Sequence, residues 1–153
     1  LPLYRACVQA VKGTLWQVIL SVGDQVDREE LGTLPDNVAV FSSVDQIAVL
    51  QKADVFLTHC GMNSASEGLY FGVPLVMLPQ TSEQSGVAVR AEQLGAGLRL
   101  RKTTPDAIRA ALEKAMDDPS YRENAEKIGA SFRASGGAKA AADCIERRFL
   151  PEK

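Results

Sequence analysis

Residues that can bind an anion gather in the middle of the chain, where positions 58–68 read Thr-His-Cys-Gly-Met-Asn-Ser-Ala-Ser-Glu-Gly. Gly61 lets the backbone approach a ligand closely. Asn63 and Ser64 stand at the expected start of a helix, where free N–H groups and the helix dipole favour an anion. His59, the only histidine of the chain, adds a hydrogen-bond donor beside this turn. The segment therefore predicts a phosphate site.

Glu67 extends this group, because it follows Ser64 by about one helical turn. Its carboxylate can accept hydrogen bonds from ribose hydroxyls. Each residue also has an ordinary interpretation: a histidine after a strand is often a packed polar residue, and Asn-Ser before a helix is a common cap. The combination of His59, a glycine, a capping pair and a carboxylate in one short segment favours a ligand site over these separate explanations.

A second polar pair, Glu83 and Gln84, follows the next apolar strand along the chain. A carboxylate accepts hydrogen bonds and an amide both donates and accepts them, so the pair suits the hydroxyl groups of a sugar. The alternative is a solvated helix N-terminus with Glu83 placed favourably for the helix dipole.

The apolar pattern predicts the elements that position these residues. Strands are expected over residues 16–22, 37–41, 55–58, 75–78 and 97–100, and helices over 3–11, 46–52, 64–71 and 83–94. This alternation predicts an α/β fold, a Rossmann-like parallel sheet with helices on both faces. Ligands of such sheets bind beyond the carboxyl ends of the strands, where both polar groups lie. Three helices are expected to follow, from Pro105, over 119–132 and over 138–148, the last after Gly136-Gly137.

Composition limits the function classes. The 153 residues, 46% of them hydrophobic, fit one globular domain. Lys and Arg total 17 against 19 Asp and Glu, so no nucleic-acid partner is expected. No apolar run reaches the roughly 20 residues that span a bilayer, and the three cysteines have neither disulfide-framework nor zinc-site spacing. A cytoplasmic protein with no membrane span and no metal site is predicted.

From residue 43 to residue 84 the chain resembles the donor-binding signature of the family 1 glycosyltransferases, above all the bacterial macrolide and flavonoid group. The resemblance extends over nearly the whole chain, because residues 134–137 also resemble the family's carboxyl end. The matching residues are Thr58, His59, Cys60, Gly61, Asn63, Ser64, Glu67, Gly72, Val73, Pro74, Pro79, Glu83 and Gln84.

The resemblance implies a residue-by-residue assignment to a UDP-sugar donor. The diphosphate is assigned to His59, Gly61, Asn63 and Ser64, the ribose to Glu67, the nucleoside to Ser43, Val44 and Gln46, and the sugar to Glu83, Gln84 and Met62. Ser43 and Asp45 depart from the family, which carries an aromatic residue and a proline at these positions, and Met62 stands where plant members have tryptophan. A serine offers no surface on which a base can stack, so we expect a weak nucleoside contact.

The resemblance further implies that residues 1–153 are the carboxyl-terminal half of a two-domain, GT-B enzyme. Such an enzyme transfers a hexose from a UDP-sugar to a hydroxyl of a small-molecule acceptor, with inversion and with no cofactor besides the UDP-sugar. The acceptor pocket and the catalytic base belong to an amino-terminal domain outside this chain, so no catalytic residue is assigned here. Two alternatives stay open: a nucleotide-sugar epimerase or hydrolase on the same scaffold, and a non-catalytic nucleotide-binding module.

Overall fold

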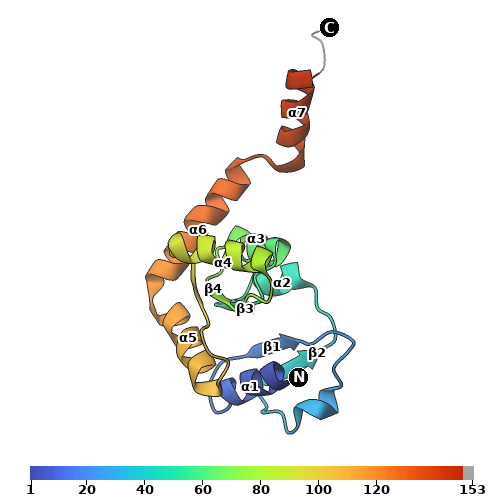
Figure 1. Cartoon of the computed structure of the whole chain (residues 1–153), viewed down its shortest axis with the longest axis vertical. Coiled ribbons are helices and arrows are strands. Elements are labelled where there is room, and N and C mark those ends of the chain that lie inside the picture. Colours follow the sequence, from blue (N-terminus) through green and yellow to red (C-terminus); the bar gives the residue numbers. More distant parts are fainter. Residues whose placement is uncertain (150–153) are drawn as a thin grey trace.

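A computed structural model describes residues 1–149 of the chain (Figure 1). The strands are β1 (Val18–Ser21), β2 (Val38–Phe41), β3 (Phe56–Thr58), β4 (Leu75–Met77) and β5 (Gly97–Arg99). The helices are α1 (Pro2–Val11), α2 (Gln46–Leu50), α3 (Met62–Tyr70), α4 (Ser82–Gln93), α5 (Pro105–Asp117), α6 (Pro119–Ala134) and α7 (Gly137–Phe149), with a 3-10 turn, η1 (Arg28–Leu31). Every predicted helix and strand is present, and η1 is an addition.

The helix starts follow local chemistry. Thr104 caps α5 by accepting a hydrogen bond from the backbone N–H of Ala107, and Pro105 occupies the first turn, where no N–H is needed. Asp118 caps α6 in the same way, ahead of Pro119. These residues fix where two helices begin independently of tertiary packing.

All strand pairs are parallel, as predicted, and the strands form two sheets. One contains β1 and β2, and the other contains β3, β4 and β5 in that order. The single sheet expected from the sequence is therefore divided between β1 and β3, since no described residue forms a ladder between them. The last strand, β5, pairs only with β4 and is an edge strand.

Helices cover both faces of these strands, which confirms the predicted α/β class. Helices α1 and α5 pack on one face and bury Val8, Ile108 and Leu112. Helices α3, α4 and α6 pack on the other face, around the buried side chains of Leu75 and Met77. Strand β4 is buried along its whole length because it lies between these two cores.

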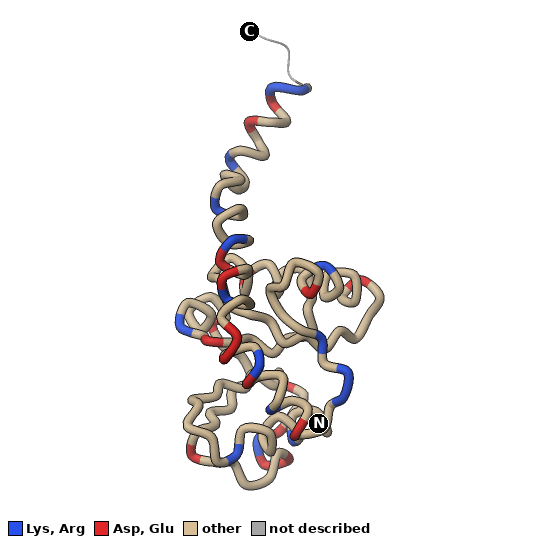
Figure 2. The backbone as a smooth tube through the Cα atoms, turned by 90° about the vertical axis from the view of Figure 1, so that its left-hand side faces the viewer, with Lys and Arg blue, Asp and Glu red and all other residues tan. Residues whose placement is uncertain are grey.

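Helix α7 extends away from the body of the molecule (Figures 1 and 2), and it has no buried residue. Gly136 and Gly137 precede it with φ angles of 75° and 59°, a left-handed conformation that glycine adopts without strain. Figure 2 shows basic and acidic residues interspersed along the backbone. Among residues 1–149, no helix is both long and apolar enough to cross a bilayer.

Candidate functional site

The turn between β3 and α3 carries the predicted phosphate residues. Its sharpest point is Cys60, which is fully buried and has a φ of 66°, in the left-handed region that non-glycine residues rarely adopt. The side-chain oxygen of Thr58, itself buried, accepts a hydrogen bond of 3.1 Å from the backbone N–H of Cys60. This contact holds the turn in its strained shape.

Helix α3 begins at Met62, two residues earlier than predicted, and Gly61 is its N-cap. Asn63 and Ser64 therefore lie in the first turn and do not cap the helix, which corrects the sequence-based interpretation. Gly61 has no side chain to cap with, and the first helical hydrogen bond runs from the N–H of Ala65 to the carbonyl of Gly61, at 2.9 Å. The N–H groups of the first turn precede the helical ladder and can bind an anion.

His59 is exposed at this helix start, and its imidazole lies against the backbone of Gly61. A Cβ atom placed on Gly61 would be 2.7 Å from Nε2 of His59 and 3.4 Å from its Cδ2. Only a glycine leaves room for the ring in this position. The ring therefore lies beside the first turn of α3, as the phosphate-site prediction requires.

Glu67 is held by Gln46, a contact between α3 and α2. The side-chain amide of Gln46 donates a 2.5 Å hydrogen bond to Oε2 of Glu67 and a longer one, 3.5 Å, to the hydroxyl of Ser64. Asp45 caps α2 by accepting a hydrogen bond from the N–H of Ala48, at 3.0 Å. The structure thus joins a predicted nucleoside residue to the predicted ribose and diphosphate residues through one amide.

The other two predicted nucleoside residues lie in the loop between β2 and α2. Ser43 is exposed and Val44 is half-buried. Gln46 follows this loop at the start of α2, and its side chain donates a hydrogen bond to Ser64. The loop therefore ends beside the β3–α3 turn.

The predicted sugar residues lie at the start of α4 and on α3. Thr81 caps α4, and the side-chain oxygen of Gln84 accepts a 2.7 Å hydrogen bond from the backbone N–H of Gln80. The Gln84 oxygen is thus engaged within the protein, while Glu83 and Met62 are exposed.

Electrostatics connect the two turns. Burial raises the pKa of the Cys60 thiol to about 11, and the negative charge of Glu83 contributes to the same shift. Strands β3 and β4 are parallel neighbours, so the turns that follow them, with the predicted diphosphate and sugar residues, lie at the same edge of the sheet.

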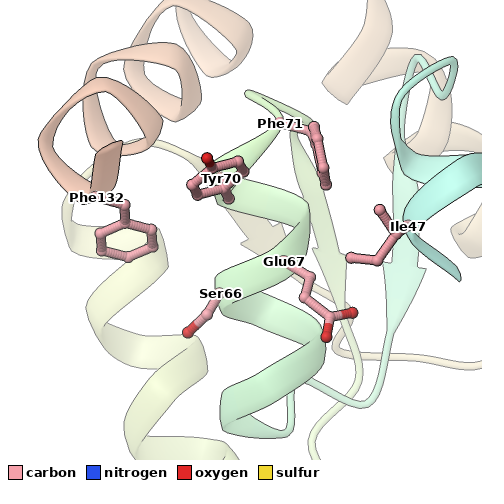
Figure 3. Close-up of a pocket in the computed structure, with 6 residues that line it drawn as sticks. All are labelled: Ile47, Ser66, Glu67, Tyr70, Phe71 and Phe132. Carbon is pink, nitrogen blue, oxygen red and sulfur yellow. The ribbon is translucent and has the colours of Figure 1, made fainter. Parts of the chain in front are cut away.

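A hollow of about 260 Å³ borders Glu67 on α3 (Figure 3). Figure 3 shows the Phe71 ring and Ile47 on the side of α3 to which the Glu67 carboxylate points, and Tyr70 and Phe132 toward the other side. This hollow was not predicted, because Phe132 of α6 joins the other lining residues only through tertiary packing. A second hollow, of about 460 Å³, is lined by residues around η1 and contains none of the predicted donor residues.

No set of three or more His, Cys, Asp and Glu side chains within residues 1–149 is arranged to hold a metal ion. The β3–α3 turn presents hydrogen-bond donors, the His59 ring and the first N–H groups of α3, with the carboxylates of Glu67 and Glu83 nearby. This pattern suits a phosphorylated ligand that carries hydroxyl groups.

Comparison with known proteins gives a consistent family. The chain is 40% identical over 150 residues to the NDP-glycosyltransferase YjiC of Bacillus licheniformis, an alignment that includes 97% of this chain and 38% of that protein. It is 39% identical over 147 residues to the oleandomycin glycosyltransferase of Streptomyces antibioticus, including 94% of this chain and 34% of that protein. The chain thus spans less than two fifths of the length of these relatives.

Solved structures agree in fold. The glycotransferase of kitacinnamycin superposes with a TM-score of 0.90 at 43% identity, and 99% of this chain covers 40% of that chain. CalG4, the calicheamicin glycosyltransferase, also gives 0.90, at 35% identity, with 98% of this chain covering 40% of that one. Glycosyltransferase VinC, solved in complex with dTDP, gives 0.79 at 27% identity, with coverages of 94% and 37%. Residues 8–146 match the family described as "Erythromycin biosynthesis protein CIII-like, C-terminal domain", and the chain belongs to this family of glycosyltransferase carboxyl-terminal domains.

Proposed function

We propose that this chain is the donor-binding domain of an inverting glycosyltransferase that transfers a hexose from a UDP-sugar to a hydroxyl of a small-molecule acceptor. One observation carries the proposal: the His59 imidazole lies against Gly61 at the start of α3, which has no side-chain cap. One turn further on, Gln46 holds the Glu67 carboxylate. This order of groups matches the order of diphosphate and ribose in a nucleotide.

The diphosphate is the leaving group of such a transfer, and its charge grows as the bond to the sugar breaks. The first-turn N–H groups of α3, the helix dipole and His59 offset that charge at fixed positions. The proposal therefore includes no metal and no cofactor besides the UDP-sugar. Glu83 and the Gln84 amide bind the sugar hydroxyls, and Met62 lies beside them.

The acceptor and the catalytic base are assigned to an amino-terminal domain outside residues 1–153. The assignment of the whole of residues 1–153 to the donor domain is part of the same proposal. Cys7, Cys60 and Cys144 are free thiols in the described part of the chain, which supports a reducing, cytoplasmic setting.

The proposal is tested by titrating UDP-glucose into the isotopically labelled chain and following amide signals. We expect shifts at residues 61–64 and at Glu67, with the UDP-glucose left intact because the catalytic base is assigned to the amino-terminal domain. Uridine should shift the Glu67 region and leave residues 62–64 nearly unchanged. Shifts confined to the hollow around η1, or none at all, would refute the assignment of the donor site.

A further inference from the structure

Helices α3 and α4 carry predicted donor residues at one end only. Helix α3 begins at the turn after β3 and returns the chain to the start of β4, and α4 does the same between β4 and β5. Because these strands are parallel, both helices end at the amino edge of the sheet, opposite the donor residues. A contact at that edge can move the donor residues only by moving a whole helix.

The far end of α3 is bound by a side chain of α6. The carbonyl of Leu69 accepts a hydrogen bond from the N–H of Gly72, at 3.0 Å, within the turn that ends the helix. The last carbonyl of α3, that of Tyr70, accepts from the guanidinium of Arg133, whose central carbon lies 5.5 Å from the centroid of the Tyr70 ring. A cation at the carboxyl end of a helix also interacts favourably with its dipole. A side chain from outside α3 therefore contributes to the hydrogen bonding of its last turn.

The backbone of α6 approaches the same end of α3, and Figure 1 shows the two helices beside each other. Ala125 and Gly129, one turn apart, are the buried residues of α6. A Cβ atom placed on Gly129 would be 2.6 Å from the carbonyl oxygen of Leu69 and 2.7 Å from that of Tyr70. These oxygens belong to the backbone, so they can move away only if the end of α3 moves.

Helix α6 makes similar contacts with the segments that follow α4 and α2. The side-chain amide of Asn124 donates a 3.3 Å hydrogen bond to the carbonyl of Gly95, just after α4. The guanidinium of Arg122 donates to the carbonyls of Ala53 and Asp54, between α2 and β3, at 3.3 and 2.9 Å. One helix thus contacts the chain beyond the far ends of all three helices that carry predicted donor residues.

We propose that α6 fixes the geometry of the donor site through the far ends of these helices, and that Arg133 and Gly129 are positioning residues for α3. The inference rests on the proposed function, because it concerns the same site. Helix α3 has nine residues and is about 13 Å long, so a displacement of its end moves its first turn as well. That displacement would shift the first-turn N–H groups and strain the hydrogen bond between Gln46 of α2 and Glu67 of α3.

The test compares Arg133→Ala with Arg148→Ala in the chain of residues 1–153. Arg148 is an exposed arginine of α7, the helix with no buried residue, so its replacement removes the same charge away from α3. The amide signals of residues 61–64 are recorded by nuclear magnetic resonance without ligand, and UDP affinity is measured by calorimetry. Circular dichroism verifies that each protein is folded. A third variant, Arg133→Lys, restores a cationic donor at the same position.

In Arg133→Ala the signals of residues 61–64, at the other end of α3, should shift. The Kd for UDP should rise about three- to thirtyfold, the range of substitutions that act on a site from a distance. Arg148→Ala should leave the signals in place and the Kd within about twofold. Arg133→Lys should recover most of the lost affinity. A loss of folding stability alone would not raise the Kd of a chain that is still folded.

Gly129→Ala is an independent variant that decides the question if Arg133→Ala does not fold. It keeps the arginine and displaces the end of α3 by direct contact, so the same signals should shift and UDP should bind more weakly. Signals of residues 61–64 that stay in place in a folded variant would overturn the proposal, as would shifted signals with unchanged UDP affinity. An unaltered chain that does not bind UDP would refute the proposed function instead, and the ligand-free signals would still show whether α6 positions α3.

Discussion

Replacing Gly61 by alanine tests whether the His59 ring is placed by its contact with this glycine. The φ of Gly61 is −60°, which alanine adopts freely, so the substitution strains no backbone angle. The new methyl group would stand 2.7 Å from Nε2 of His59, well inside van der Waals contact. The imidazole is exposed and can rotate away, so the fold survives and the ring is displaced.

Two magnitudes follow from this geometry. Alanine is a poorer N-cap than glycine, which sets the loss in unfolding free energy at about 1 kcal/mol or less. A lost hydrogen bond to a charged group costs about 1.5 to 3 kcal/mol, so UDP binding should weaken by roughly ten- to a hundredfold. Uridine has no diphosphate, and its affinity should stay within about twofold.

Calorimetric titration of UDP and uridine into both proteins measures these losses. The matched control is Gly86→Ala on α4, where an added Cβ meets nothing within 4 Å. That variant should bind UDP as the unaltered chain does and unfold at a slightly higher temperature, because alanine favours helix. Unchanged UDP affinity in folded Gly61→Ala would refute the placement of His59 at the diphosphate.

Three further results are expected. Ser43→Trp should tighten UDP binding by on the order of 1 kcal/mol in calorimetry, with most of the gain kept for uridine, because the new ring stacks on the base; no gain would place the base elsewhere. Gln46→Ala should weaken uridine and UDP alike by about 1 kcal/mol, while pyrophosphate binding stays unchanged, because the lost amide holds Glu67; weaker pyrophosphate binding would contradict this role. Burial, with a contribution from the nearby Glu83 carboxylate, raises the pKa of Cys60 from 9.0 to about 11. The contribution of the neutral thiol to the free energy of unfolding is therefore present below pH 9 and is lost as the pH rises toward 11. At about pH 8, mass spectrometry should find iodoacetamide on exposed Cys144 well before Cys60, and equal rates would contradict the burial.

Local chemistry explains which elements the sequence predicted well. Strand β4 is a short run of apolar residues, and helix α5 begins with the capping residue Thr104 followed by Pro105. Both elements appear where the sequence predicts them. The start of α3 was misplaced because Asn63 and Ser64 are typical capping residues. The helix begins after Gly61 because the backbone turns at Cys60, which has a left-handed conformation and donates a hydrogen bond to the Thr58 hydroxyl.

Other features depend on contacts between distant segments. The bond between Gln46 and Glu67 joins residues 21 positions apart, and spacing along one helix does not indicate it. The hydrogen bond between Gln80 and Gln84 is local, only four positions apart, but it depends on the shape of the β4–α4 turn, which the residue types do not indicate. The division of the sheet was not predicted, because alternating helices and strands indicate parallel pairing and do not state which strands are neighbours. The donor assignments of individual residues stay predictions.

The substitution His59→Ala tests whether the turn between β3 and α3 binds the diphosphate of a nucleotide sugar, as we propose. UDP and uridine are titrated into the unaltered chain and into the variant, with circular dichroism to verify the fold. UDP binding should lose about 1.5 to 3 kcal/mol, and uridine binding should be unchanged. Equal losses for the two ligands, or none for either, would show that His59 does not contact the diphosphate.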